Sequence, residues 1–181
     1  LQAGKTIPLP HQIKQFKILK YKQGYQLNTF VETGTFLGEM VSAMNIFFKR
    51  IYSIELSPEL AENAKIHFKK FSHIEIIEGD SSTELSNTLR NINKPCLFWL
   101  DGHYSGGNTA KGEKECPILE ELDSIAKYAN LKSAILIDDA RLFDGTNDYP
   151  DIEEIKNWTA LNLPSYSILI EDDIIILKPN N

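Results

Sequence analysis

The residues with the clearest chemical potential lie at Glu32, Gly34 and Gly38, within the segment FVETGTFLG of residues 30–38. An apolar run ends at Glu32, and two glycines separated by three residues follow. This order is typical of a strand, a tight turn and a helix start. Gly34 can take a positive φ and, having no side chain, lets a ligand approach the backbone. Glu32 would then lie at the carboxyl end of a strand, where open α/β sheets bind ligands.

Acidic residues recur where the expected strands end. They are Glu32, Glu55, Asp80, Asp101, Asp138 and Asp139. In a parallel sheet these ends lie on one edge, and carboxylates crowded there are unfavourable for stability unless a ligand or cation uses them. This periodic placement indicates a binding edge more strongly than any single motif does.

Glu55 and Asp80 suggest how a nucleotide-like ligand would be held. Glu55 follows the glycine turn by about 20 residues, a spacing at which a carboxylate accepts both hydrogen bonds of a ribose diol. The alternative is a surface acid that caps the next helix. Asp80, followed by Ser81, would bind an adenine amino group or only N-cap the next helix.

A second group consists of Asp101, His103, Asp138 and Asp139. The fourth and fifth expected strands are neighbours, so the three carboxylates can converge on one point. Carboxylate oxygens suit a hard divalent cation such as Mg²⁺. His103, with an ordinary pKa of about 6.5, suits a general base. The alternatives are an ordinary loop imidazole at His103 and a capped turn at the aspartate pair.

Short apolar runs alternate with helical patterns, and these elements must position the acids. We expect strands at residues 29–32, 51–55, 74–77, 96–101 and 134–138, and helices at 38–49, 58–70, 81–91, 113–128 and 151–161. Residues 166–170 and 174–177 are separated by three residues, so they form an antiparallel hairpin. The pattern predicts an α/β, Rossmann-like, doubly wound and mostly parallel seven-stranded sheet, with helices on both faces.

Two regions are expected along the chain. Residues 1–27 form an N-terminal helical extension, with a helix at 11–22 that places Ile13, Phe16, Lys17 and Leu19 near one face. Residues 28–181 form a single domain. Because the chain begins at Leu1 rather than at a methionine, we expect a piece of a longer protein.

The composition restricts the function. The 181 residues are 42% hydrophobic and 24% charged, as in an ordinary globular domain. The net charge of -6 argues against a nucleic-acid surface, and no apolar run approaches the roughly 20 residues of a membrane span. Cys96 is expected to be buried, and Cys116, at a helix start, to be more exposed. Two cysteines that form no metal-type pair suggest a reducing, cytoplasmic location.

Residues 31–38 (VETGTFLG), the dipeptide Ile54-Glu55 and the dipeptide Gly79-Asp80 resemble the class I S-adenosylmethionine-dependent methyltransferases over residues 28–178. The resemblance implies S-adenosylmethionine as cofactor. It also implies that the loop of Glu32, Thr33, Gly34, Thr35 and Gly38 lies against its methionine part. Glu55 would hold the ribose, Asp80 and Ser81 would flank the adenine, and Asp101 would also contact the cofactor.

The second group of acids resembles that of the macrocin-type metal-dependent O-methyltransferases, which act on sugars and related natural products. The resemblance implies a divalent metal on Asp101, Asp138 and Asp139 that binds two adjacent hydroxyls of a small-molecule substrate, such as a sugar. It implies His103, beside Asp101, as the catalytic base. Independently of the resemblance, two long loops carry candidate substrate contacts, which are Lys111, Lys114, Arg141, Asp144 and Tyr149. Residues 106–112 are expected to cover the site, and the alternative is a plain flexible connection.

Two other functions remain open. A nicotinamide-dependent oxidoreductase would use a related fold, but it prefers the turn Gly-x-Gly-x-x-Gly, whereas this chain has Glu-x-Gly-x-x-x-Gly. A methyltransferase-like domain without turnover would keep the ligand-binding acids. The sequence leaves the acceptor and the oligomeric state open, a homo-oligomer included.

Overall fold

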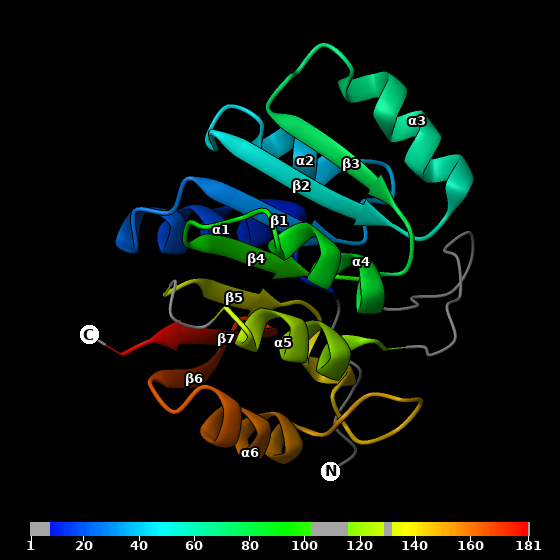
Figure 1. The fold of residues 1–181 in the computed structure, drawn as a ribbon. Coiled ribbons are helices and arrows are strands. Elements are labelled where there is room, and N and C mark those ends of the chain that lie inside the picture. Colours follow the sequence, from blue (N-terminus) through cyan, green and yellow to red (C-terminus); the bar gives the residue numbers. More distant parts are fainter. Residues whose placement is uncertain (1–7, 103–115, 129–131, 181) are drawn as a thin grey trace.

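The computed structural model of the chain describes residues 8–102, 116–128 and 132–180. Within these residues, seven strands form one sheet in the order β3-β2-β1-β4-β5-β7-β6 (Figure 1). The strands are β1 (Thr29–Thr33), β2 (Arg50–Glu55), β3 (Ile74–Glu78), β4 (Cys96–Leu100), β5 (Ala134–Ile137), β6 (Tyr166–Glu171) and β7 (Ile174–Pro179). The first five strands are parallel to one another, and β7 is antiparallel to both β5 and β6.

Helices cover both faces of the sheet (Figure 1). The helices are α1 (His11–Gly24), α2 (Glu39–Met44), α3 (Pro58–Phe68), α4 (Ser81–Leu89), α5 (Ile118–Ala126), the short 3₁₀ helix η2 (Ala140–Leu142) and α6 (Ile152–Asn162). Ile18 of α1, Val41 of α2 and Phe68 of α3 belong to one core cluster. Leu85 of α4, Leu122 of α5 and Ile155 of α6 belong to a second cluster. The sheet therefore lies between two layers of helices.

The fold class predicted from the sequence is confirmed, including the antiparallel C-terminal hairpin. Element bounds differ at several helix ends. The first helix after the glycine turn ends at Met44 rather than near Lys49, and α5 begins at Ile118, after Pro117. Ser57 N-caps α3 and Pro58 takes its first position, as their residue types predict.

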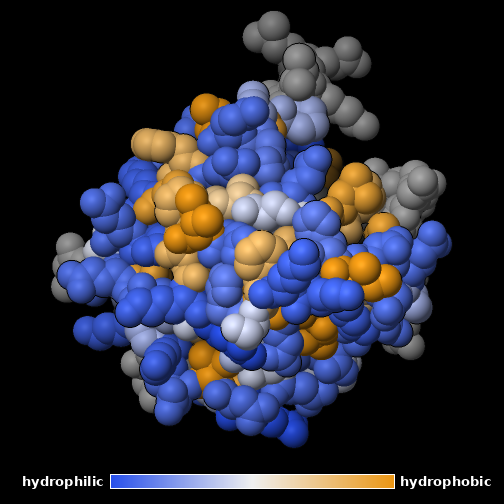
Figure 2. Space-filling model, turned by 90° about the horizontal axis from the view of Figure 1, so that it is seen from above, coloured by the Kyte–Doolittle hydropathy of each residue, from blue (hydrophilic) through white to orange (hydrophobic). Residues whose placement is uncertain are grey.

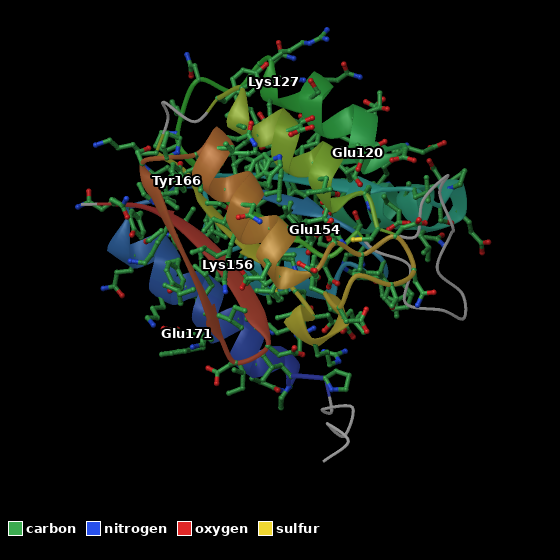
Figure 3. The ribbon with its side chains drawn as sticks, turned by 90° about the horizontal axis from the view of Figure 1, so that it is seen from below. Glu120, Lys127, Glu154, Lys156, Tyr166 and Glu171 are labelled. Carbon is green, nitrogen blue, oxygen red and sulfur yellow. The ribbon has the colours of Figure 1, made fainter. Side chains whose placement is uncertain are left out.

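The buried face of α1 corrects a prediction. Ile13 and Phe16, expected to lie on the packed face, are exposed. Lys17, expected on the same face, is buried, and so are Ile18 and Tyr21. The ammonium of Lys17 binds the carboxylates of Glu171 and Asp172 at 2.9 and 2.7 Å. Figure 3 shows Glu171 at the end of β6, beside α1. These ion pairs with residues distant in sequence allow Lys17 to be buried. Hydrophobic periodicity alone therefore does not predict the buried face of α1.

The surface seen from above carries separate groups of apolar residues among hydrophilic ones (Figure 2). Among the described residues, no helix is both long and apolar enough to cross a membrane. The acids predicted to bind a ligand lie at or just after the carboxyl ends of the parallel strands.

Candidate functional site at the carboxyl edge of the sheet

Backbone hydrogen bonds bring the carboxyl ends of the five parallel strands together. The bonds run from the N–H of Gly79 to the carbonyl of Glu55 (2.9 Å), from Gly34 to Ile54 (2.9 Å), from Asp101 to Thr33 (3.1 Å) and from Asp138 to Leu100 (3.1 Å). Each bond joins the residues that leave one strand to the end of its neighbour. The predicted acidic residues therefore line one continuous edge.

Gly34 lies directly against the end of β4. Its φ is +84°, and an added Cβ would lie 2.4 Å from the carbonyl oxygen of Asp101. Any side chain here would collide with backbone, so the turn needs glycine both for its conformation and for its space. The close approach also joins the two predicted groups of residues, because Gly34 belongs to the first and Asp101 to the second.

A chain of hydrogen bonds supports Glu32 inside the sheet. The hydroxyl of Ser53, the register partner of Glu32 on β2, donates to Glu32 Oε2 at 2.5 Å. The hydroxyls of Ser53 and Thr35 are 2.6 Å apart. Ser53 was not among the predicted site residues. Its signal is a small polar residue in an otherwise apolar strand, opposite an acid.

Burial raises the pKa of Glu32 well above its usual range. The hydrogen bond from Ser53 opposes this rise, and the carboxylates of Asp101 and Glu55 add to it. Since Glu32 is only 2% exposed, these neighbours act across a region with little water. The negative charges of Asp101 and Glu55 thus oppose ionisation of Glu32, and a cationic ligand would relieve that repulsion.

Glu55 ties the glycine turn to the next strand. Its Oε2 accepts a hydrogen bond from the N–H of Phe36 at 2.7 Å, and its Oε1 accepts one from Ser57 at 2.9 Å. Each carboxylate oxygen has a second lone pair. Glu55 can therefore hold the turn in place and still accept hydrogen bonds from a ligand diol.

The remaining residues predicted to contact the cofactor lie in the same region. Asp80 N-caps α4, accepting a bond from the N–H of Ser82 at 2.9 Å, so the capping role is observed and ligand binding stays a prediction. Ser81 is buried at the first position of α4, and Gly38, with φ +74°, precedes α2. The Thr33 hydroxyl is buried with no hydrogen-bond partner among the described residues, which is the kind of group that a bound ligand satisfies.

Asp101, Asp138 and Asp139 come together as the sequence predicts. One carboxylate oxygen of each lies within 4.8 Å of the others. Asp138 and Asp139 are buried, and Asp139 takes the left-handed conformation with φ +56° at the start of η2. Hard divalent cations prefer such oxygen ligands, so the donor set is chemically suitable for one.

A lysine from the N-terminal helix reaches this cluster. The ammonium of Lys14 hydrogen-bonds Oδ2 of Asp138 and lies 3.9 Å from Oδ1 of Asp139. It also lies 6.0 Å from the centre of the Trp99 ring, over the core residue of β4. The sequence analysis did not identify Lys14, because 124 residues separate it from Asp138.

Burial and the neighbouring charges shift the pKa values of both Lys14 and Asp138. Burial by itself would lower the pKa of Lys14, but Asp138, Asp101 and Asp139 together raise it. Burial and the neighbouring Asp139 raise the pKa of Asp138, although Lys14 opposes this. The neighbouring carboxylates therefore raise the pKa of Lys14, whereas burial is the largest cause of the rise at Asp138.

Arg141, predicted as a substrate contact, is engaged by two acids. One guanidinium nitrogen binds Asp139 Oδ1 at 2.7 Å, and the same nitrogen binds Asp173 of the β6–β7 turn. Tyr149 is buried and Asp144 is exposed. Arg141 thus fixes the far side of the cluster to the C-terminal hairpin.

Several predicted residues cannot be placed. His103, Lys111 and Lys114 lie outside the described residues, together with the predicted cover at 106–112. Cys116, expected to be more exposed than Cys96, is instead buried at 4% exposure. The helix starts two residues later, so the thiol packs into the core that covers β4 and β5 rather than at the helix surface.

Comparison with known proteins finds the fold in solved structures alone. No family model matches the sequence, and no curated protein matches. The chain is similar to the SAH-bound methyltransferase PaMTH1 of Podospora anserina, with 14% identity, 96% of this chain and 80% of that chain covered, and a TM-score of 0.63. It is also similar to the O-methyltransferase of Bacillus cereus in complex with SAH, with 15% identity, coverage of 98% and 84%, and a TM-score of 0.62.

An rRNA methylase from Streptococcus thermophilus has the same fold, with 13% identity, coverage of 97% and 99%, and a TM-score of 0.57. Identities this low establish the fold and not the reaction. The chain has the class I methyltransferase fold, and two of these structures contain SAH, the demethylated product of S-adenosylmethionine.

Proposed function

We propose that this chain, which has the class I methyltransferase fold, binds S-adenosylmethionine and transfers its methyl group to an oxygen of a small molecule, such as a sugar hydroxyl. The observation that carries the proposal is the joint placement of the Gly34 turn and Glu55. Phe36 of the turn donates its backbone N–H to Glu55 at 2.7 Å, which puts a ribose-type acceptor beside the turn that Gly34 opens. Residues 28–181 would form the catalytic domain and residues 1–27 its extension.

The charge of the edge suits this cofactor. S-adenosylmethionine carries a sulfonium and an ammonium group, and the negative charges of Asp101 and Glu55 already oppose ionisation of Glu32 by repulsion. A cationic ligand relieves that repulsion, whereas a polyanion such as RNA increases it. This difference supports a small-molecule acceptor over the nucleic acid that one similar structure's name describes.

The chain's own residues would orient the reactants. In methyl transfer the acceptor oxygen bonds to the methyl carbon as the carbon–sulfur bond breaks, and a base takes the acceptor's proton. The backbone carbonyl of Asp101 lies against Gly34, and its carboxylate belongs to the aspartate cluster. Asp101 therefore connects the proposed cofactor site with the cluster. His103, two residues further on, remains the proposed base.

The divalent cation stays a prediction. Asp101, Asp138 and Asp139 would hold it through carboxylate oxygens, and it would lower the pKa of a bound hydroxyl. A cation that binds here must displace the ammonium of Lys14, because that ammonium already hydrogen-bonds Asp138.

Thermal unfolding with added ligands tests the proposal. A ligand that binds only the folded chain raises the melting temperature. We expect millimolar S-adenosylmethionine and SAH to raise it, and NAD to leave it unchanged. A shift with NAD alone would favour the oxidoreductase, and no shift with any of the three would refute cofactor binding. Binding without methyl transfer to any hydroxyl acceptor would favour the domain without turnover.

A further inference from the structure

We infer that Lys14 is the resident cation of the Asp101–Asp138–Asp139 cluster, and that its ammonium occupies the place a divalent metal ion would take. Removing the ammonium should therefore convert the cluster into a metal-binding site. This inference concerns cation binding and holds whether or not the chain transfers methyl groups.

The first support for the inference is the position of Lys14. Its ammonium contacts Asp138, lies 3.9 Å from Asp139, and interacts electrostatically with Asp101. The lysine comes from α1, while the acids follow β4 and β5. A cation from a distant helix thus faces all three carboxylates that could ligate a metal.

The state of Asp138 gives a second, independent reason. Its side chain is only 1% exposed, and its Oδ1 has no hydrogen-bond partner among the described residues. A buried carboxylate oxygen without a partner costs stability. Lys14 satisfies only one oxygen of Asp138, so a divalent cation that replaced its ammonium would find the second oxygen available as well.

Coulombic competition decides which cation is bound. An ammonium and a divalent ion close to the same carboxylate repel each other, so the metal must displace Lys14. Arg141 adds a further positive charge beside Asp139. In the unaltered chain the acids are therefore shared by two covalently attached cations, and a dissolved metal ion competes poorly with them.

The variant Lys14→Met removes the ammonium and keeps a long apolar side chain for packing. Its matched control is Lys17→Met, on the same helix, where the lysine binds Glu171 and Asp172 instead. A third variant, Lys14→Met with Asp139→Asn, removes one proposed metal ligand. Each of the three variants and the unaltered chain is titrated with Mn²⁺ alone. Calorimetry measures the affinity, and thermal unfolding measures the stabilisation by the metal.

We expect Lys14→Met to bind Mn²⁺ at least about tenfold more tightly than the unaltered chain or Lys17→Met, a difference of about 1.4 kcal/mol. The added Asp139→Asn substitution should abolish the gain. Equal Mn²⁺ affinity in Lys14→Met and the unaltered chain, or a gain that survives Asp139→Asn, would overturn the inference.

A Lys14→Met variant that is unfolded without metal still tests the inference. The inference then requires Mn²⁺ to restore the native circular dichroism spectrum of this variant. A folding defect that Mn²⁺ does not repair would show that Lys14 is needed for another reason, and would equally overturn it.

Discussion

The carboxylate of Glu55 accepts a 2.7 Å hydrogen bond from the backbone N–H of Phe36, so the end of β2 holds the glycine turn that follows β1. Phe36 has a positive φ of 49°, which a bulky residue adopts only when its surroundings enforce it. Glu55 is thus a support for the turn as well as the proposed ribose ligand.

Replacing Glu55 tests both roles. Glu55→Gln keeps the size of the side chain but leaves one oxygen where two now accept N–H groups, so we expect SAH to bind at least about tenfold more weakly. Calorimetry measures the affinity. Glu78→Gln is the matched control, because Glu78 is the register partner of Glu55 on β3 and pairs with Lys65 at the surface. Unchanged SAH affinity in folded Glu55→Gln would contradict the assignment.

Gly34→Ala should destabilise the chain and block the cofactor. The new Cβ would lie 2.4 Å from the Asp101 carbonyl oxygen at φ +84°, so we expect a loss of at least about 2 kcal/mol in urea unfolding. Gly24→Ala, at the end of α1 where no atom lies within 4 Å of the added Cβ, should unfold like the unaltered chain. Equal stability of the two variants would mean that the turn is not packed on β4 as described.

The stability of the chain should depend on pH through Glu32. Burial is the largest cause of the raised pKa of Glu32 in the folded chain. In the unfolded chain the pKa of a glutamate is about 4.3. The folded chain therefore keeps the proton on Glu32 to a higher pH than the unfolded chain does. The folded state therefore loses stability as the pH rises above that value, towards the folded-state pKa. Glu32→Gln, which can still accept the bond from Ser53, should lack this loss.

Urea unfolding at pH 5 and pH 8 measures this effect. We expect the stability advantage of Glu32→Gln over the unaltered chain to be larger at pH 8, and the exposed control Glu62→Gln to show no such change. An advantage that is constant or shrinks with rising pH would contradict the raised pKa of Glu32.

Both cysteines should be unreactive in the folded chain. Burial raises the pKa of Cys96 and of Cys116 to about 12, so little thiolate is present near pH 8. Labelling with a disulfide reagent should be slow in buffer and should reach both thiols in urea. Rapid native labelling of Cys116 would instead support the exposure expected from the sequence.

The sheet was predictable because each parallel strand is a short apolar run that ends in a polar or acidic residue. Glu32, Glu55 and Asp101 mark such ends, and the register places them on one edge. The short link between Ile170 and Ile174 allowed only a hairpin. These signals are local in sequence, so they need no knowledge of tertiary contacts.

The contacts that the sequence did not reveal are those between distant residues. In the sequence, Lys14 cannot be told from an ordinary surface lysine. Only the fold, in which α1 lies against the acids that follow β5, brings it to Asp138. Ser53 becomes meaningful only in register with Glu32. Ile13 and Phe16 predicted an apolar face that the fold leaves exposed, because α1 packs on the core through Ile18 and Tyr21.

A crystal structure of the chain with SAH tests the central claim most directly. The account predicts SAH at the carboxyl edge of the sheet, with its methionine part against Gly34 and its ribose hydroxyls within hydrogen-bonding distance of the Glu55 carboxylate. SAH bound elsewhere, or a ribose that does not contact Glu55, would contradict it.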